Sequence, residues 1–118
     1  MPEATAKLRH LRIAPRKVRL VANLIRGKTV AQARGILTFT LKRSAEPLLK
    51  LLNSAAANME NAARERRERI DTDEMIIKEI TVGPGRTLHR WISAPRGRAV
   101  PIRKRSSHVH IVISDRKK

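Results

Sequence analysis

Aromatic residues are almost missing from this chain of 118 residues, which has one tryptophan, one phenylalanine and no tyrosine. Proteins that grip single-stranded nucleic acid by stacking its bases need several exposed aromatic rings. Any nucleic-acid binding by this chain should therefore depend mainly on phosphate contacts and on the shape of the nucleic acid.

Cysteine is absent as well, which excludes disulfides and zinc sites built from thiolates. No apolar run approaches the roughly 18 residues that suggest a membrane span. The first residues also lack the apolar region of a secretory signal. We therefore expect a cytosolic protein with no membrane partner.

Acidic residues are few, and the formal net charge of +17 predicts a polyanionic partner, because like charges repel one another within a compact chain. The length indicates one domain, residues 1–118, with a modest core. So small a domain leaves little apolar material for a deep substrate cavity. We expect a binding surface, no enzyme activity and no cofactor.

The segment from Ile80 to Ser114 contains no acidic residue. Eight of the ten acids lie between positions 46 and 79 instead. Glycine and proline punctuate the acid-free segment, and two strand-like stretches flank it. We predict an extended basic hairpin at about 83–104 that reaches roughly 30 Å at 3.3 Å per residue. Such a run favours contact with a polyanion, and it holds seven cations: Arg86, Arg90, Arg96, Arg98, Arg103, Lys104 and Arg105.

The rest of the chain predicts helices and strands in turn. Pro15 and Gly27 are typical of a helix start and end. Thr29 and Gln32 form a capping-box pattern before a second helix. Residues 64–69 could extend the third helix or form a loop. The expected elements are an edge strand at 5–13, helices at 15–26, 30–40 and 47–62, and strands at 75–82 and 108–113.

Several polar residues allow more than one interpretation. His108 and His110 lie on one strand face and could bind a metal or act as an acid/base pair, but no third ligand is placed near them, so no metal site is expected. Asp71, Asp73 and Glu74 are more typical of a turn. Trp91 should be exposed, either stacking on a base or covering the hairpin.

A second cationic surface surrounds the first helix. Its charges either contact nucleic acid or only keep the protein soluble. They are Arg12, Arg16, Lys17, Arg19, Arg26 and Lys28.

Three ordered blocks resemble a known family. They are the basic helix start at 12–21 with its continuation at 24–28, the small-residue segment Leu52-Asn53-Ser54-Ala55-Ala56-Ala57-Asn58, and Gly97-Arg98-Ala99 followed by residues 102–109. Together, from Ala6 to Ser114, they resemble large-subunit ribosomal protein number twenty-two.

The resemblance implies an α+β fold, with three helices packed on a three-stranded antiparallel sheet and a long protruding β-hairpin. It also implies binding to large-subunit (23S-type) rRNA, support of ribosome assembly, and a hairpin tip in the wall of the polypeptide exit tunnel. The implied RNA-binding residues of the body are Arg12, Arg16, Lys17, Arg19, Arg26, Lys28 and Asn58. Those of the hairpin are Arg86, His89, Arg90, Trp91, Arg96, Arg98, Arg103, Lys104, Arg105, Ser107 and His108.

The tunnel tip implied by the resemblance is Ile92, Ser93, Ala94, Pro95 and Arg96. Family members usually show Pro-Arg-Ala-Arg-Gly-Arg at the tip, so that Ala94 stands here in place of an arginine. The implied partners are rRNA, neighbouring large-subunit proteins and, transiently, the nascent polypeptide, on a cytoplasmic or organelle ribosome. No homo-oligomer is expected. A DNA-binding architectural protein with a basic β-ribbon remains the main alternative.

Overall fold

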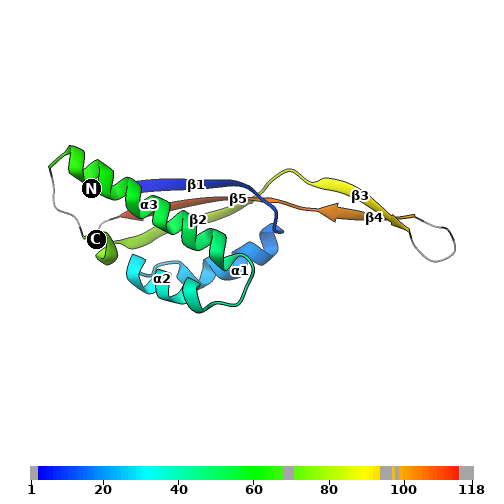
Figure 1. The fold of residues 1–118 in the computed structure, drawn as a ribbon, viewed down its shortest axis with the longest axis horizontal. Helices are drawn as coiled ribbons and strands as arrows, with labels where there is room; N and C mark the ends of the chain where they lie inside the picture. The colour runs from blue at the N-terminus through cyan, green and yellow to red at the C-terminus, as the bar shows by residue number, and fades with distance from the viewer. Residues whose placement is uncertain (1–2, 68–70, 94–96, 98, 115–118) are drawn as a thin grey trace.

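A three-stranded antiparallel sheet and three helices form the body of the protein (Figure 1). The computed structural model describes residues 3–67, 71–93, 97 and 99–114. The sheet order is β1-β5-β2, with β1 at Glu3–Leu11, β5 at Ser107–Ser114 and β2 at Ile76–Pro84. The helices are α1 (Pro15–Ile25), α2 (Val30–Phe39) and α3 (Ala45–Glu65). The expected α+β fold is confirmed.

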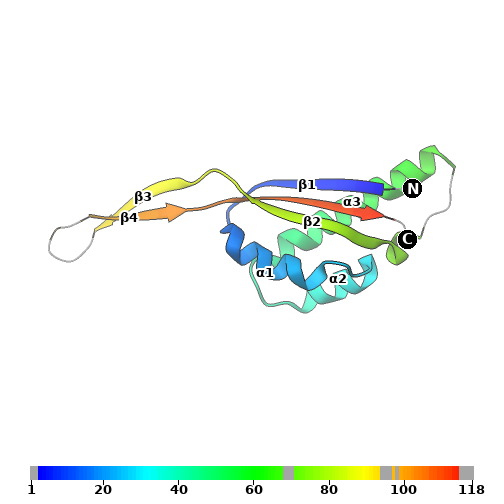
Figure 2. The same cartoon turned by 180° about the vertical axis from the view of Figure 1, so that it is seen from behind.

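One face of the sheet carries the core. Along β5 the side chains of Val109, Ile111 and Ile113 are buried, whereas His108 and His110 are half-buried on the opposite face. This alternation is the one predicted, because successive side chains of a strand point to opposite faces. The helices cover the apolar face, and the view from behind shows the sheet in front of α3 (Figure 2).

Local sequence signals determine where the first two helices begin and end. Pro15 occupies the first turn of α1, and Gly27 follows its end with a φ of +76°. The Thr29 hydroxyl accepts from the backbone N–H of Gln32, while the Gln32 amide oxygen accepts from that of Thr29, both at 3.2 Å. The predicted capping box is thus confirmed, although α2 ends at Phe39, one residue early.

The third helix buries Leu48, Leu52, Ala55 and Met59, as its apolar stripe predicts. Further along, Ala63 is buried and the expected Ala62 is only half-buried. A helix has 3.6 residues per turn, so a stripe extrapolated in steps of three and four drifts around the axis. The helix ends at Glu65, so residues 64 and 65 extend it, whereas residues 66 and 67 form a turn. Residues 68–70 lie outside the described residues.

Strand β1 lies two residues nearer the N-terminus than expected. Its pairing with β5 shifts register between Leu8 and Leu11, where His10 has a φ of +59°. This bulge bends the chain, so Ile13 is buried in the turn before α1 and not in a strand. Strand β2 was expected at 75–82 and is found at Ile76–Pro84, with a bulge between Ile77 and Glu79.

A second, two-stranded sheet forms an arm beyond the body. Strands β3 (Leu88–Ser93) and β4 (Ala99–Lys104) pair antiparallel, and the arm projects from one end of the body (Figure 1). The molecule therefore measures 67 × 26 × 21 Å. A short 3-10 helix, η1 (Thr72–Glu74), leads into β2. Among the described helices, none is both long and apolar enough to cross a membrane.

Candidate nucleic-acid interface

The arm presents cations on both of its strands. His89 of β3 lies directly opposite Arg103 of β4. Like charges opposite each other destabilise an isolated strand pair whenever the histidine is protonated. Among the arm's described cations the structure shows one side-chain hydrogen bond, from Arg90 to the carbonyl of His89 at 3.0 Å. The exposed basic residues described here are Arg86, His89, Arg90, Arg103, Lys104 and Arg105.

Trp91 is the one tryptophan of the chain, and it lies on the arm. It is 69% exposed and pairs in register with Pro101 of β4. Its exposure confirms the prediction, and a ring so open has a face available for a base. Of the predicted tip, Ala94, Pro95, Arg96 and the nearby Arg98 lie outside the described residues. The tip residues Ile92 and Ser93 are described only as the last residues of β3.

The root of the arm is fastened by short hydrogen bonds. The backbone N–H of Gly85 donates to the carbonyl of Ser106 at 2.8 Å. The Ser106 hydroxyl donates to the carbonyl of Arg86 at 2.6 Å. A Cβ on Gly85 would lie 2.6 Å from that hydroxyl oxygen, so a larger residue there would force the Ser106 side chain to shift. These contacts fix the point at which the chain leaves the body sheet.

Two residues expected at the RNA surface have contacts inside the protein. Ser107 is fully buried, and its hydroxyl donates to the carbonyl of Ile13 at 2.6 Å, so it holds the turn before α1. His108 is half-buried, and its Nδ1 accepts from the backbone N–H of His10 at 3.1 Å. The proton of a neutral His108 therefore lies on Nε2. No group of three metal-ligating side chains occurs in the described part of the chain.

Three of the expected body residues bond the free edges of the sheet. Arg26 donates to the carbonyl of Ile80 at 2.7 Å, and Arg19 to that of Val82 at 3.1 Å. Both carbonyls belong to β2, an edge strand. At the other edge, the amide of Asn58 donates to the carbonyl of Thr5 in β1 at 2.9 Å. Edge strands leave alternate carbonyls unpaired, and these side chains satisfy them.

The other expected body cations are exposed, and their side chains form no bond with the described residues. They are Arg12, Arg16, Lys17 and Lys28. The expected body cations are therefore of two kinds: arginines that bond the sheet edge and side chains that remain available to a partner.

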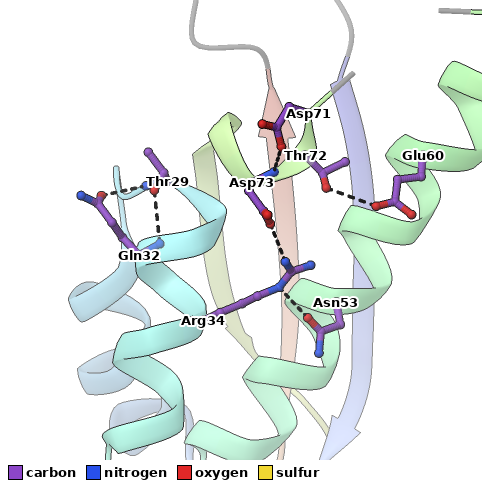
Figure 3. A network of polar contacts seen from close by, with 8 residues as sticks. All are labelled: Thr29, Gln32, Arg34, Asn53, Glu60, Asp71, Thr72 and Asp73. Atoms are coloured by element: carbon purple, nitrogen blue, oxygen red, sulfur yellow. Dashed lines mark hydrogen bonds and ion pairs between the residues drawn. The ribbon is translucent and has the colours of Figure 1, made fainter. Parts of the chain in front are cut away.

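Acidic side chains gather at the end of the body away from the arm. There Arg34 of α2 bonds Asp73 of η1 and Asn53 of α3, at 2.6 and 2.9 Å (Figure 3). Asp71 caps η1 by accepting from the backbone N–H of Asp73, as a turn residue should, and Thr72 donates to Glu60. Sequence reasoning missed this network because its members come from three separate elements.

Another ion pair lies across the open face of the sheet. Lys78 of β2 donates to the carboxylate of Glu3 in β1, and this contact raises the pKa of Lys78. Both side chains are exposed, so water weakens the attraction. Among the described residues, three acidic side chains thus pair with cations of the body: Glu3, Glu46 and Asp73.

Comparison with known proteins gives consistent matches over nearly the whole chain. The family model described as ribosomal protein L22p/L17e matches residues 6–114. The chain is 45% identical over 116 residues to large ribosomal subunit protein uL22 of Myxococcus xanthus, covering 98% of this chain and 99% of that protein. It is 49% identical to the protein of the same name in Desulfitobacterium hafniense, and the match covers 99% of this chain and 98% of that protein. It is 51% identical to the one in Mesoplasma florum, and the match covers 96% of each chain.

Proposed function

Because the chain belongs to the ribosomal protein L22p/L17e family, we propose that it is a structural constituent of the large ribosomal subunit that binds 23S-type rRNA. Proteins of this family are structural and are not enzymes. In this proposal the chain acts as one domain, supports assembly of the rRNA, and contributes the tip of its arm to the wall of the polypeptide exit tunnel.

The unmatched charge of the arm carries the proposal. Its exposed cations have no carboxylate in the acid-free segment to pair with, and the ion pairs among the described residues are all in the body. A two-stranded ribbon is marginally stable alone in water. Phosphates on both sides of the ribbon would relieve the repulsion between its strands and release bound counterions. The arm therefore fits a narrow space between rRNA segments.

The body adds contacts of two types. Four exposed cations of the body contact phosphate groups directly: Arg12, Arg16, Lys17 and Lys28. Arg19 and Arg26 each have N–H groups beyond those that bond β2, since a guanidinium has five, and can bridge the sheet edge to a phosphate. Asn58 keeps its amide oxygen for a 2′-hydroxyl. On the arm, Trp91 stacks on a base, and on β5 of the body the Nε2–H of His108 donates to phosphate.

The remaining partners follow from the position of the tip. In the proposal the tip at residues 92–96 meets the nascent polypeptide transiently, and neighbouring large-subunit proteins contact the body. The relatives compared above come from bacteria, which favours a cytoplasmic ribosome. With Ala94 in place of an arginine, the tip has one cation fewer to offer a nascent chain than family members usually have.

A competition experiment separates this function from that of a DNA-binding architectural protein. Labelled 23S rRNA bound to the full chain is challenged with unlabelled rRNA or with duplex DNA at equal salt. We expect rRNA to displace the label at far lower concentration than DNA. Equal displacement by duplex DNA would contradict the proposal. Retention of tagged protein on large subunits through a high-salt wash gives an independent check.

A further inference from the structure

We propose that a pocket in the body binds one unpaired nucleotide of the rRNA, with its phosphate among four cations and its base on an apolar wall. The pocket lies between the start of α1 and the connection from α2 to α3, and has a volume of about 400 Å³. Small-ligand sites measure about 300–1,000 Å³. The inference rests on the proposed function, because rRNA supplies the nucleotide.

The charge of the pocket has one sign. Among the residues that the structure describes, no acidic one lines it. The side chains of its cations form no ion pair or hydrogen bond within the described part of the chain, unlike Arg19, Arg26 and Arg34. Four unpaired cations around one hollow repel each other until an anion enters. They are Arg12, Lys17, Lys42 and Arg43.

A buried hydroxyl also faces the pocket. Ser44 precedes α3 and is 2% exposed, yet its side chain does not cap the helix and takes part in no hydrogen bond with the described residues. No fully enclosed side-chain oxygen or nitrogen of those residues lacks a partner. The Ser44 hydroxyl is therefore not sealed in the core. It opens into the pocket that it lines, where it can donate to a phosphate oxygen.

Part of the pocket lining is apolar. Ile13 and Ala14 line the pocket from the turn before α1, and Leu20 lines it from the helix itself. Leu20 is 57% exposed, so its side chain offers apolar surface that a ligand in the pocket would cover. A base lying on Leu20 would remove that surface from water. A simple anion would not, so the wall favours a whole nucleotide over free phosphate.

The position of the pocket agrees with this partner. The start of α1 and the connection between α2 and α3 lie at the end of the body from which the arm projects (Figures 1 and 2). An acidic protein segment could also neutralise the cations. RNA is favoured because the unpaired cations of the arm lie at the same end, so that one polyanion can serve both.

The phosphate contact is tested by filter binding of the full chain to 23S rRNA over a range of salt concentrations. The variant Lys42→Ala/Arg43→Ala removes two pocket cations. The control Arg64→Ala/Arg66→Ala removes the same charge from exposed positions at the other end of α3. The pocket variant should flatten the slope of log affinity against log salt by up to roughly 0.7, the value for one phosphate of a single strand. The control should leave the slope near that of the unaltered chain.

The base contact is tested with Leu20→Ala against Leu24→Ala. Leu24 is 48% exposed one turn further along α1 and does not line the pocket. Removing the apolar side chain should weaken rRNA binding roughly fivefold in Leu20→Ala with an unchanged salt slope. Leu24→Ala should bind like the unaltered chain.

The outcomes separate the two proposals. If the unaltered chain binds rRNA but each variant matches its control, the pocket is not a nucleotide site, whereas the proposed function stands. An acidic protein segment in the pocket would give that same result. If the unaltered chain shows no preference for rRNA over duplex DNA, the proposed function fails and this inference fails with it.

Discussion

The body and the arm of this protein use charge in opposite ways. In the body, a continuous core lies under the sheet, and Arg19, Arg26 and Arg34 bond carbonyls or carboxylates of the protein itself. In the arm, exposed cations lie on a two-stranded ribbon, and no acidic side chain occurs between Ile80 and Ser114. The difference indicates that the body supplies the stability; in the proposed function, rRNA holds the arm in its working shape.

A substitution in the core of the body should have the largest effect on the free energy of unfolding. Leu52 of α3 is fully buried, so Leu52→Ala should lower the free energy of unfolding by about 2–5 kcal/mol through reduced burial and the cavity left behind. Urea unfolding followed by circular dichroism measures the change. As a control, Leu41→Ala alters a fully exposed leucine and should change the free energy by less than roughly 0.5 kcal/mol. Similar changes for the two would contradict the assignment of the core.

The root of the arm should be the next most sensitive position. In Gly85→Ala the new Cβ meets the Ser106 hydroxyl oxygen at 2.6 Å and disturbs its bond to Arg86. We expect a decrease of about 1–3 kcal/mol in the free energy of unfolding. Gly83→Ala, with nothing within 4 Å of its Cβ, is the matched control and should change little. If both variants unfold at the same urea concentration, the root is looser than described.

The sheet edge gives a smaller and more specific effect. Arg26→Ala removes the bond to the Ile80 carbonyl and should lower the free energy of unfolding by about 1 kcal/mol. Arg16→Ala removes an exposed arginine of the same helix that bonds nothing in the described chain, and should weaken rRNA binding without altering stability. Equal stability of the two variants would show that the bond to β2 contributes nothing.

A further test concerns two glycines with open space around them. Gly35 lies exposed within α2, so Gly35→Ala should stabilise the protein by about 0.5–1 kcal/mol. Gly27 has a φ of +76°, so Gly27→Ala should destabilise it by about 1–2 kcal/mol. Thermal unfolding monitors both. A gain for Gly27→Ala would mean that the end of α1 does not need a left-handed residue.

Much of the fold could be predicted because its signals are local. Pro15, Gly27 and the Thr29/Gln32 capping box mark helix ends within a few residues of themselves, and the alternation along β5 identifies its buried face. The bulge at His10 could not be predicted, because it depends on pairing with a strand almost a hundred residues away. The expected strand at 5–13 was misplaced for that reason.

The candidate site was less predictable than the fold. Cations of the arm stand out in the sequence as an acid-free run. The sequence gives no sign of the hydrogen bonds that four site residues make within the protein, because each bond joins residues more than 50 positions apart. These residues are Arg19, Arg26, Asn58 and Ser107. Composition likewise gives no sign of the pocket beside Ser44, which draws its lining from two separate segments.

The role of the arm is tested most directly by replacing residues 87–104 with an Asn-Gly turn and measuring the affinity for rRNA at several salt concentrations. A short turn can join the two segments there, because Gly85 and Ser106 are already hydrogen-bonded to each other. Unfolding in urea should show a body of nearly unchanged stability. The slope of log affinity against log salt should flatten by roughly 0.7–0.9 for each phosphate that the shortened chain no longer neutralises. An unchanged slope and affinity would contradict the claim that the arm is a phosphate-binding element.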